Sequence, residues 1–322
     1  MRYLEQSVIP LSFRALTRLC AALVVVLLVS ACKSNAKDTP KADTNAANAA
    51  WTRPFLYVID GPKKSYVFGT IHVGDPRLAS YPPALKDALA NANVVNTEIP
   101  LDVAVQMRFS QATVLPDNRT IADEVPKATL DRTRLAFATK GLPFKPFEHM
   151  RPWFVAMQVA LLDHIFDTGK PLDARIYNEA QKEKKEVGGL ETVEEQVAIF
   201  DALTPAEQVE MLEAALDGRD KAMKEKKDPI KDLLESYIQG DDKVLQAALD
   251  KETDSQKPLD VKMKKRMITD RNVTMTDRIA ERVRAAPDKS YFFAVGSAHV
   301  IGPDGIVEKL KAKGFTVSRA VP

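Results

Sequence analysis

The 322-residue sequence contains few side chains that bind metal ions through nitrogen or sulfur, since it has 4 His and 2 Cys. Two of the histidines end the same short pattern, GTIH from Gly69 to His72 and GSAH from Gly296 to His299. Neutral imidazole is a good ligand for Zn, Mn, Co or Fe. One Gly-x-x-His alone is better explained by a buried structural histidine, but two copies in matched contexts favour a shared site.

Glu98 is the third candidate, because it ends the apolar segment NVVNTEI. A carboxylate at the end of a buried strand is costly unless it is hydrogen-bonded, paired or bound to a metal. A helix-capping or salt-bridged glutamate is the alternative. If the three strands are neighbours, His72, Glu98 and His299 meet at the carboxyl ends of the strands, where α/β sheets bind ligands. Two histidines and a carboxylate are a recognised metal-binding set with open positions.

The elements that must position these residues lie at the two ends of the chain. Short β-branched and aromatic runs predict a hairpin across residues 54–73, then a helix from Pro82 to Asn91 and a strand across 93–99. Near the end, a strand across 289–300 precedes a helix across 302–314, which Gly314 closes, and a last strand across 315–321.

The middle of the chain is helical. Amphipathic periodicity predicts helices at about 126–139, 151–166, 173–184, 193–201, 205–226, 229–239, 241–250 and 258–285, with one short strand within 185–192. We expect one α/β (α+β) domain over 51–322, with its sheet built from the chain ends and a large helical insertion between them.

Several other polar residues have two explanations each. Glu191 could line the same cleft, although the Thr192–Glu195 spacing of a capping box favours a helix start there. Asp173 is typical of a helix N-cap. Arg271 and Asn272, taken alone, are expected at the surface. His149 adjoins a Pro- and aromatic-rich segment that could form a cleft wall, whereas His164 lies on an apolar helix and is expected to be structural.

Other chemistries find no support in the sequence. It contains no HExxH motif, no Walker loop, no dinucleotide fingerprint and no Gly-x-Ser-x-Gly elbow. Two cysteines cannot build a disulfide framework or a four-cysteine metal site. The net charge of +2 gives no reason to expect nucleic acid as a partner.

Residues 1–31 have the features of a lipoprotein signal peptide. Basic residues precede a short apolar run that ends at Val29-Ser30-Ala31-Cys32, which is typical of a lipidation site at Cys32. Residues 32–50 then form a flexible tether without large apolar side chains. Removing residues 1–31 leaves 43 basic and 43 acidic residues, so the mature chain is nearly neutral. We expect an envelope lipoprotein that is anchored to the membrane by lipid, at the outer membrane and facing the periplasm.

Six segments together resemble the TraB/GumN family, which is related to the Tiki proteases and more distantly to ChaN and erythromycin-esterase-like folds. They are FGTIHVGD (68–75), VVNTEIP (94–100), MRPWF (150–154), GGLETVEEQ (188–196), RNVTMTDRI (271–279) and FFAVGSAHVIGPDGI (292–306). The resemblance implies a pseudo-symmetric mixed sheet and a metal-dependent hydrolase of the peptidase type. It also implies that Arg271 and Asn272 are substrate or oxyanion partners.

The leading hypothesis is metal-assisted hydrolysis of a peptide or protein substrate. His72 and His299 hold a divalent ion (Mn, Co, Zn or Fe), while Glu98 is either a further ligand or the general base, and Arg271 stabilises the oxyanion. The alternative is an envelope lipoprotein that binds haem or iron through the histidine pair without turnover. A third hypothesis is a scaffold whose site has decayed. The sequence leaves the substrate, the metal and the oligomeric state open.

Overall fold

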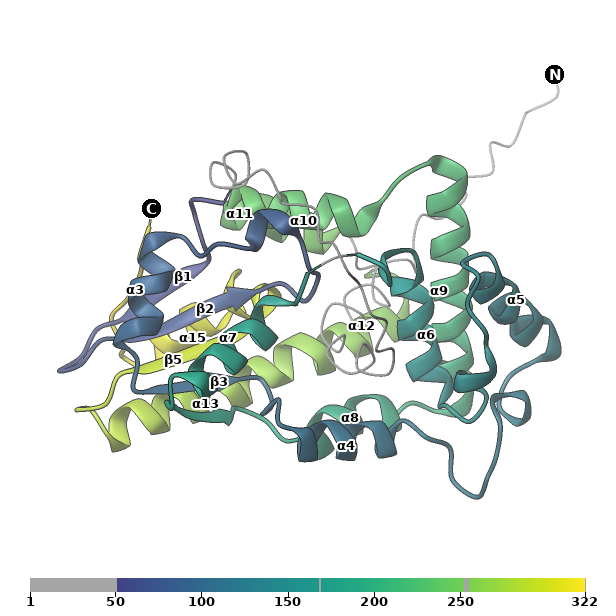
Figure 1. Ribbon diagram of the computed structural model, residues 1–322, viewed down its shortest axis with the longest axis horizontal. Coiled ribbons are helices and arrows are strands. Elements are labelled where there is room, and N and C mark those ends of the chain that lie inside the picture. The colour runs from purple at the N-terminus through teal and green to yellow at the C-terminus, as the bar shows by residue number, and fades with distance from the viewer. Residues whose placement is uncertain (1–50, 168, 252–254, 322) are drawn as a thin grey trace.

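A computed structural model describes residues 51–167, 169–251 and 255–321. Its centre is a six-stranded sheet in the order β4-β3-β5-β2-β1-β6 (Figure 1). The strands are β1 (Leu56–Ile59), β2 (Ser65–Thr70), β3 (Val94–Thr97), β4 (Glu186–Gly189), β5 (Tyr291–Gly296) and β6 (Val317–Arg319). The mixed α/β fold with strand-rich chain ends is therefore confirmed.

Strand direction decides where the candidate residues meet. β5 runs parallel to both β2 and β3, and β3 runs parallel to β4. Strand β1 runs antiparallel to both of its neighbours, β2 and β6. Its antiparallel pairing with β2 is the predicted hairpin. Thr70 at the end of β2 pairs with Gly296 at the end of β5. The carboxyl ends of β2, β5 and β3 therefore share one edge of the sheet, as predicted for neighbouring strands.

The sheet has its own hydrophobic core, to which both chain ends contribute. Phe55, Phe68, Phe292 and Phe293 are fully buried in it. Helix α7 (Leu172–Lys182) packs on β3, β4 and β5. The same core takes in apolar residues of α3 (Pro83–Asn91), α10 (Pro229–Gln239), α11 (Asp242–Asp250), α13 (Arg271–Ala285) and α15 (Ile306–Ala312).

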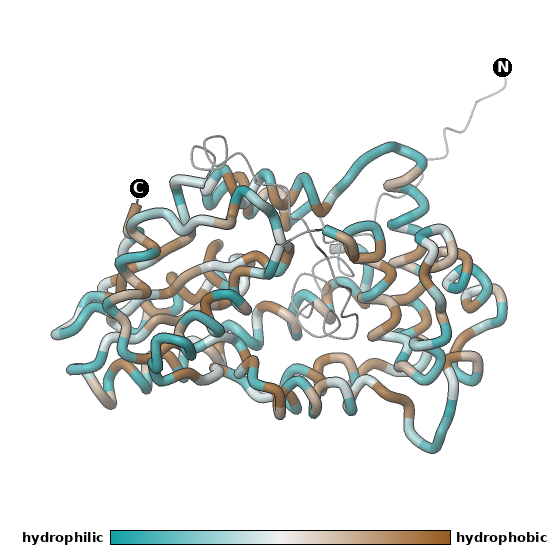
Figure 2. Tube along the Cα trace, viewed as in Figure 1, coloured by the Kyte–Doolittle hydropathy of each residue, from teal (hydrophilic) through white to brown (hydrophobic). Residues whose placement is uncertain are grey.

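The helical insertion has a second core, seen at the right of Figure 1. It is built from α4 (Val103–Ala112), α5 (Lys127–Ala138), α6 (Pro152–Leu161), α8 (Val193–Asp201), α9 (Pro205–Glu225) and α12 (Pro258–Lys264). Trp153 of α6 stacks on Phe200 of α8 with ring centroids 4.6 Å apart. Hydrophobic stretches run along both the strands and α6 (Figure 2), as two packed interiors require.

Three of the places where the structure departs from the predicted elements concern longer elements or the site itself. Helix α4 was not predicted, although Asp102 caps it by accepting a hydrogen bond from the Val105 N–H. The predicted helix across 258–285 is helical throughout, but it contains a π-helical segment, η7 (Lys265–Asp270). The residues after β5 form a short helix, α14 (Ser297–Val300), where a loop was expected.

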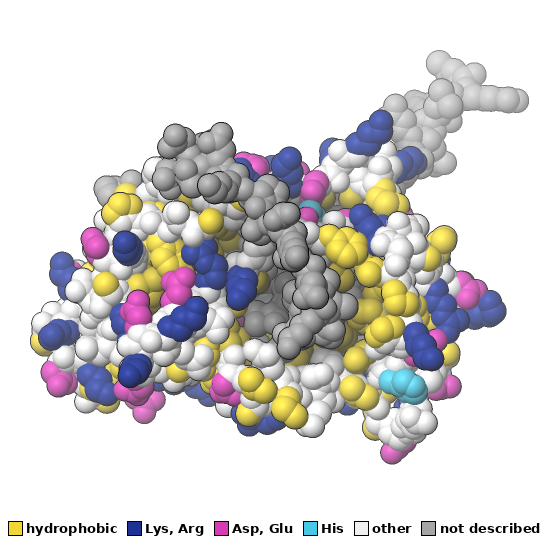
Figure 3. All heavy atoms as spheres, viewed as in Figure 1, with side chains coloured by type: hydrophobic (Ala, Val, Ile, Leu, Met, Phe, Trp, Pro, Cys, Tyr) yellow, Lys and Arg dark blue, Asp and Glu magenta, His cyan; other side chains and the backbone are white. Residues whose placement is uncertain are grey.

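Other features concern the surface and the membrane. Charged side chains of both signs are spread over the face in Figure 3, in keeping with the small formal net charge of +2 of the whole sequence. No helix among the described residues is long and apolar enough to cross a membrane. The predicted signal peptide, the lipidated Cys32 and the tether lie outside the described residues.

Candidate metal centre

The three predicted ligands meet at the shared edge of the sheet. His72 follows β2, Glu98 follows β3 and His299 lies in α14 directly after β5. Glu98 Oε1 is 3.9 Å from His72 Nε2 and 3.8 Å from His299 Nε2. The three residues are buried, with 6% or less of each exposed to solvent. Side chains separated by most of the chain length therefore form one cluster.

Hydrogen bonds to His299 determine which nitrogen carries the proton. Arg271 Nη1, which can only donate, lies 3.1 Å from His299 Nε2, so Nε2 accepts. His299 Nδ1–H then donates to Asn272 Oδ1 at 2.7 Å, while Asn272 Nδ2 donates to the Asp304 carbonyl oxygen. Burial, together with the charge of Arg271, lowers the pKa of His299 to about 3. His299 is therefore neutral, with its Nε2 lone pair directed into the cluster.

His72 has a different partner. Its Nδ1 lies 3.2 Å from Asp173 Oδ2, and an ionised carboxylate can only accept, so Nδ1–H donates. Burial lowers the pKa of His72, but the charge and the hydrogen bond of Asp173 outweigh it, and the net pKa is raised. His72 Nε2 is buried and has no hydrogen-bond partner among the described residues. This orphaned nitrogen points to a ligand.

The interpretation of Asp173 as a helix N-cap is wrong. Helix α7 begins at Leu172, its N-cap position is Pro171, and no side-chain capping bond is present there. Asp173 instead lies in the first turn and directs its carboxylate to His72. The residue could not be assigned to the site from the sequence, because its partner lies 101 positions away in the chain.

The Glu98 carboxylate divides its two oxygens between different neighbours. Oε1 faces the two imidazoles and accepts the Gly296 N–H at 2.7 Å, while Oε2 accepts from Arg271 Nη2 at 2.6 Å. Burial raises the pKa of Glu98, but three effects outweigh burial and lower this pKa to about 2: the charge of Arg271, the charges that the histidines carry when protonated, and the Gly296 hydrogen bond. So acidic a carboxyl group is a poor general base near neutral pH. The position of Oε1 within 4 Å of both imidazole Nε2 atoms favours the ligand role for Glu98 as well.

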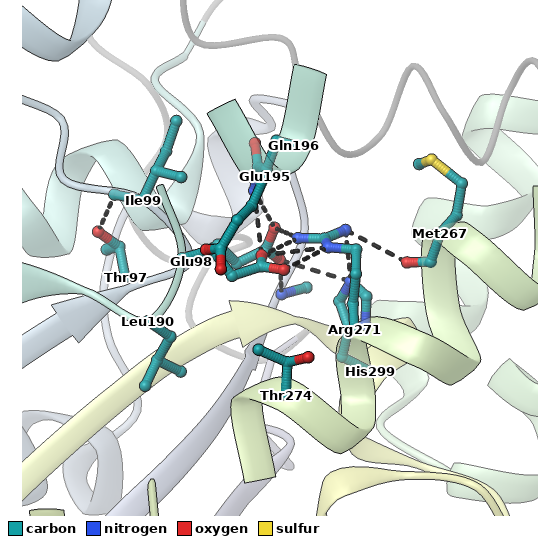
Figure 4. A network of polar contacts seen from close by, with 12 residues as sticks. Thr97, Glu98, Ile99, Leu190, Glu195, Gln196, Met267, Arg271, Thr274 and His299 are labelled. Carbon is teal, nitrogen blue, oxygen red and sulfur yellow. Dashed lines mark hydrogen bonds and ion pairs between the residues drawn. The ribbon is translucent and has the colours of Figure 1, made fainter. Parts of the chain in front are cut away.

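Arg271 is the charge centre of the site, and the expectation that it lies at the surface is wrong. It is only 5% exposed, and its Nε and Nη2 both bond to the Glu191 carboxylate, at 2.6 to 3.1 Å. Figure 4 shows its guanidinium between Glu98 and His299. Arg271 follows directly after the π-helical η7, a type of segment that often marks functional sites. Asn272 is fully buried as well.

The segment around Glu191 fulfils both expectations, but with different residues. Thr192 caps α8 in a capping box with Glu195, as predicted. Glu191 is therefore free to pair with Arg271, and its N–H donates to the Glu98 carbonyl oxygen at 2.7 Å. Gln196, which the sequence did not single out, bridges the two carboxylates with Nε2 at 3.4 Å from Glu98 and 3.3 Å from Glu191.

The two motif glycines make room for the cluster. A Cβ on Gly296 would lie 3.2 Å from both Glu98 Oε1 and His72 Nε2, inside the space that the three ligands surround. A Cβ on Gly69 would lie 3.0 Å from the Cα of Ser297, the first residue of α14. Gly69 thus allows α14 and its His299 to approach β2, and Gly296 leaves the centre of the cluster open.

The donor set fits a divalent metal ion, although the arrangement is not yet that of a bound ion. Ligand atoms about 2.1 Å from a tetrahedral ion lie about 3.4 Å apart, slightly closer than the present separations of Glu98 Oε1 from the two imidazoles. The described residues contain no group of three or more His, Cys, Asp or Glu already arranged to hold an ion. Arg271 Nη1 presently bonds His299 Nε2. Binding would require a contraction of a few tenths of an ångström and the release of this bond.

A cleft of about 530 Å³ reaches the far side of this network. Its lining includes Glu191 and Arg271 together with residues of α8, α12 and η7. The cleft therefore gives solvent access to Glu191 and Arg271, which flank the candidate ligands.

The other two histidines lie elsewhere: His149 Nδ1 bonds the Arg119 carbonyl oxygen, and His164 lies between Asp167 and Asp228 at 2.7 and 3.0 Å.

Comparison with known proteins points to one family. A sequence profile of the TraB/PrgY/gumN family matches residues 55–319. The chain is 26% identical to "Metalloprotease TIKI1" of Danio rerio over 89% of this chain and 65% of that protein. It is 24% identical to "Metalloprotease TIKI1" of Homo sapiens over 83% and 62%, and 23% identical to "Metalloprotease TIKI homolog" of Nematostella vectensis over 83% and 67%. The chain thus spans about two thirds of the length of these relatives. No solved structure matches it.

Proposed function

The chain belongs to the TraB/PrgY/gumN family, and from this premise we propose that it is a metal-dependent hydrolase that cleaves peptide bonds. The TIKI relatives, about a quarter of whose aligned residues are identical to this chain, are named metalloproteases. These names support both the metal and the protease activity. The observation that carries the proposal is the convergence of His72 Nε2, His299 Nε2 and Glu98 Oε1 at one edge of the sheet. Each histidine has its other nitrogen held by an oxygen acceptor, which is the usual arrangement of a metal ligand.

The three residues would hold a divalent ion (Mn, Co, Zn or Fe), which supplies a Lewis acid that activates water and polarises the scissile carbonyl. Glu98 would be a ligand of this ion, and its other oxygen anchors Arg271. Arg271 keeps Nε and Nη2 on carboxylates, whereas the partners of its Nη1 among the described residues are His299 and the Met267 carbonyl oxygen. Nη1 is therefore the group available to a developing oxyanion. Because the cluster is buried, these charges lie in a low-dielectric environment, where the electrostatic interactions between them are stronger than in water.

The haem- or iron-binding alternative uses the same histidine pair without turnover. None of the described contacts favours it over hydrolysis. Haem would also have to displace Glu98 Oε1, which lies within 4 Å of both imidazole Nε2 atoms. The decayed-scaffold hypothesis likewise lacks support, because all three candidate ligands are in place.

We place this activity at the cell envelope, on a lipid anchor at Cys32 that holds the domain at the outer membrane facing the periplasm. The support is the sequence of residues 1–50 alone. Replacing Cys32 by Ser should release the protein from the membrane fraction of cells that express it. Retention of the Cys32→Ser protein in that fraction would contradict the anchor.

The function is tested by turnover. Purified protein loaded with Mn²⁺, Co²⁺ or Zn²⁺ is expected to cleave members of a peptide library, and chelation should abolish cleavage. His72→Ala and His299→Ala should each abolish it as well, whereas His149→Ala, a matched change outside the cluster, should leave it intact. Equal turnover by wild type and the two site variants would show that the site is misassigned.

A further inference from the structure

The two repeated motifs hold their histidines in chemically different ways. His299 Nδ1–H donates to the neutral amide of Asn272, whereas His72 Nδ1–H donates to the carboxylate of Asp173. Asp173 comes from α7 in the helical insertion, outside both motifs. It is 6% exposed, and His72 is the one ion-pair partner found for it among the described residues. A buried carboxylate with so little compensation needs an explanation.

Further polar atoms of this pair and of its strand lack partners. Asp173 Oδ1 and the Thr70 hydroxyl are buried without a hydrogen bond among the described residues, and Thr70 lies two positions before His72 in the chain. Together with His72 Nε2, they are three buried polar atoms without a partner on His72, on its partner Asp173 and on the end of β2. Native proteins leave few such groups, and they concentrate where a ligand or a water belongs. The arrangement therefore serves His72 rather than the stability of α7.

We infer that Asp173 is a positioning residue of the metal centre: its Oδ2 holds the Nδ1 proton of His72 and so presents the Nε2 lone pair to the space beside Glu98 Oε1. The inference rests on the proposed function and adds a residue to it. A carboxylate secures this tautomer without a further contact, because it can only accept. An amide at the same position could turn its NH2 toward Nδ1, which would move the proton to Nε2 and remove the lone pair that binds the ion. A carboxylate partner also makes Nε2 of the imidazole more basic than an amide partner does, so Nε2 binds the ion more strongly.

The test uses the full chain and two independent readouts. Calorimetry with Zn²⁺ measures affinity, and ¹⁵N NMR of the metal-free protein at alkaline pH, where the imidazole is neutral, identifies the tautomer of His72. Asp173→Asn should weaken Zn²⁺ binding by about 10- to 100-fold, the usual effect of losing such a partner, and should populate the Nε2–H tautomer. Asp173→Glu, which keeps the carboxylate, should recover most of the affinity and the wild-type tautomer.

Asp163→Asn is the matched control, because Asp163 pairs with Arg219 and Lys140 and not with His72. It should leave both readouts unchanged. Unchanged Zn²⁺ affinity and an unchanged tautomer in Asp173→Asn would overturn the inference, and Asp173→Ser gives the same comparison if the amide variant does not fold. Should wild type bind none of the four ions Mn²⁺, Co²⁺, Zn²⁺ and Fe²⁺, the proposed function fails, whereas the tautomer comparison still decides the role of Asp173.

Discussion

Arg271 donates a hydrogen bond from Nη1 to Nε2 of His299 at 3.1 Å, and this nitrogen is the atom with which His299 would bind a metal ion. The other guanidinium nitrogens bond to Glu98 and Glu191. In the metal-free protein, Arg271 therefore supplies the positive charge that the buried carboxylates require. An ion that binds the cluster would take over the His299 lone pair and part of that charge compensation, while Arg271 stays on Glu191.

Removing the Arg271 charge should destabilise the metal-free protein strongly. Arg271→Met leaves two buried carboxylates without their cation, which typically costs roughly 3–5 kcal/mol in the free energy of unfolding. Saturating Zn²⁺ should return part of the loss, because a ligand that binds only the folded state stabilises it. Urea unfolding with and without Zn²⁺ measures both effects.

Arg132→Met is the control for this variant. Arg132 pairs with Asp217 and Asp220 at the surface, and such pairs contribute about 1 kcal/mol or less. If the Arg271 and Arg132 variants lost similar stability, the buried network would not have the charge balance that the contacts indicate.

A methyl group at Gly296 should block the centre of the cluster. Its Cβ would lie 3.2 Å from Glu98 Oε1 and from His72 Nε2, so Gly296→Ala is expected to lower Zn²⁺ affinity at least 10-fold while the protein still folds. Gly61→Ala places a Cβ at the same 3.2 Å from a backbone oxygen in a turn and should not change affinity. Calorimetry compares the two variants, and equal affinities would contradict the proposed place of the ion.

Loss of the Asn272 amide should affect both stability and metal binding. Asn272→Leu leaves the buried His299 Nδ1–H without an acceptor, which costs about 1–3 kcal/mol. The imidazole also loses the contact that sets its orientation, so Zn²⁺ affinity should fall about 10- to 100-fold. The exposed Asn91→Leu serves as the control. A loss of stability without any change in affinity would limit Asn272 to a structural role.

Asp163 should contribute a pH-dependent part of stability outside the site. Burial raises its pKa, but hydrogen bonds and charges from Lys140 and Arg219 outweigh this effect and hold the pKa below the ordinary 3.8. A depressed carboxyl pKa stabilises the fold above pH 3.8, and this contribution is lost as the pH falls through the folded-state value. The stability difference between wild type and Asp163→Asn should therefore be larger at pH 7 than at pH 3 in urea unfolding. A difference independent of pH would contradict the assigned shift.

The parts of the fold that local signals determine could be predicted. β-branched and aromatic runs located the strands, and the Gly-x-x-His motifs with Glu98 located three residues that the sheet brings together. The capping box of Thr192 and Glu195 located the start of α8. Each of these signals lies within a few residues of the feature it predicts, so a single sequence is enough to detect it.

The remaining parts depend on contacts between distant segments. Arg271 on an amphipathic helix resembles any exposed arginine until Glu98 and Glu191 are placed beside it. Asp173 at the start of a helix resembles a cap until His72 lies next to it. Helix α4 is the exception, because the Asp102 cap was a local signal that could have been used. The π-helical turn before Arg271 has no comparable signal in the sequence.

The most direct test of the central claim is the metal content of the purified protein. Elemental analysis of wild type after incubation with divalent ions and removal of the excess should find about one ion per chain, and His72→Ala and His299→Ala should retain almost none. An unchanged metal content in both variants, or none in wild type under any of the four ions, would contradict a metal centre formed by His72, Glu98 and His299.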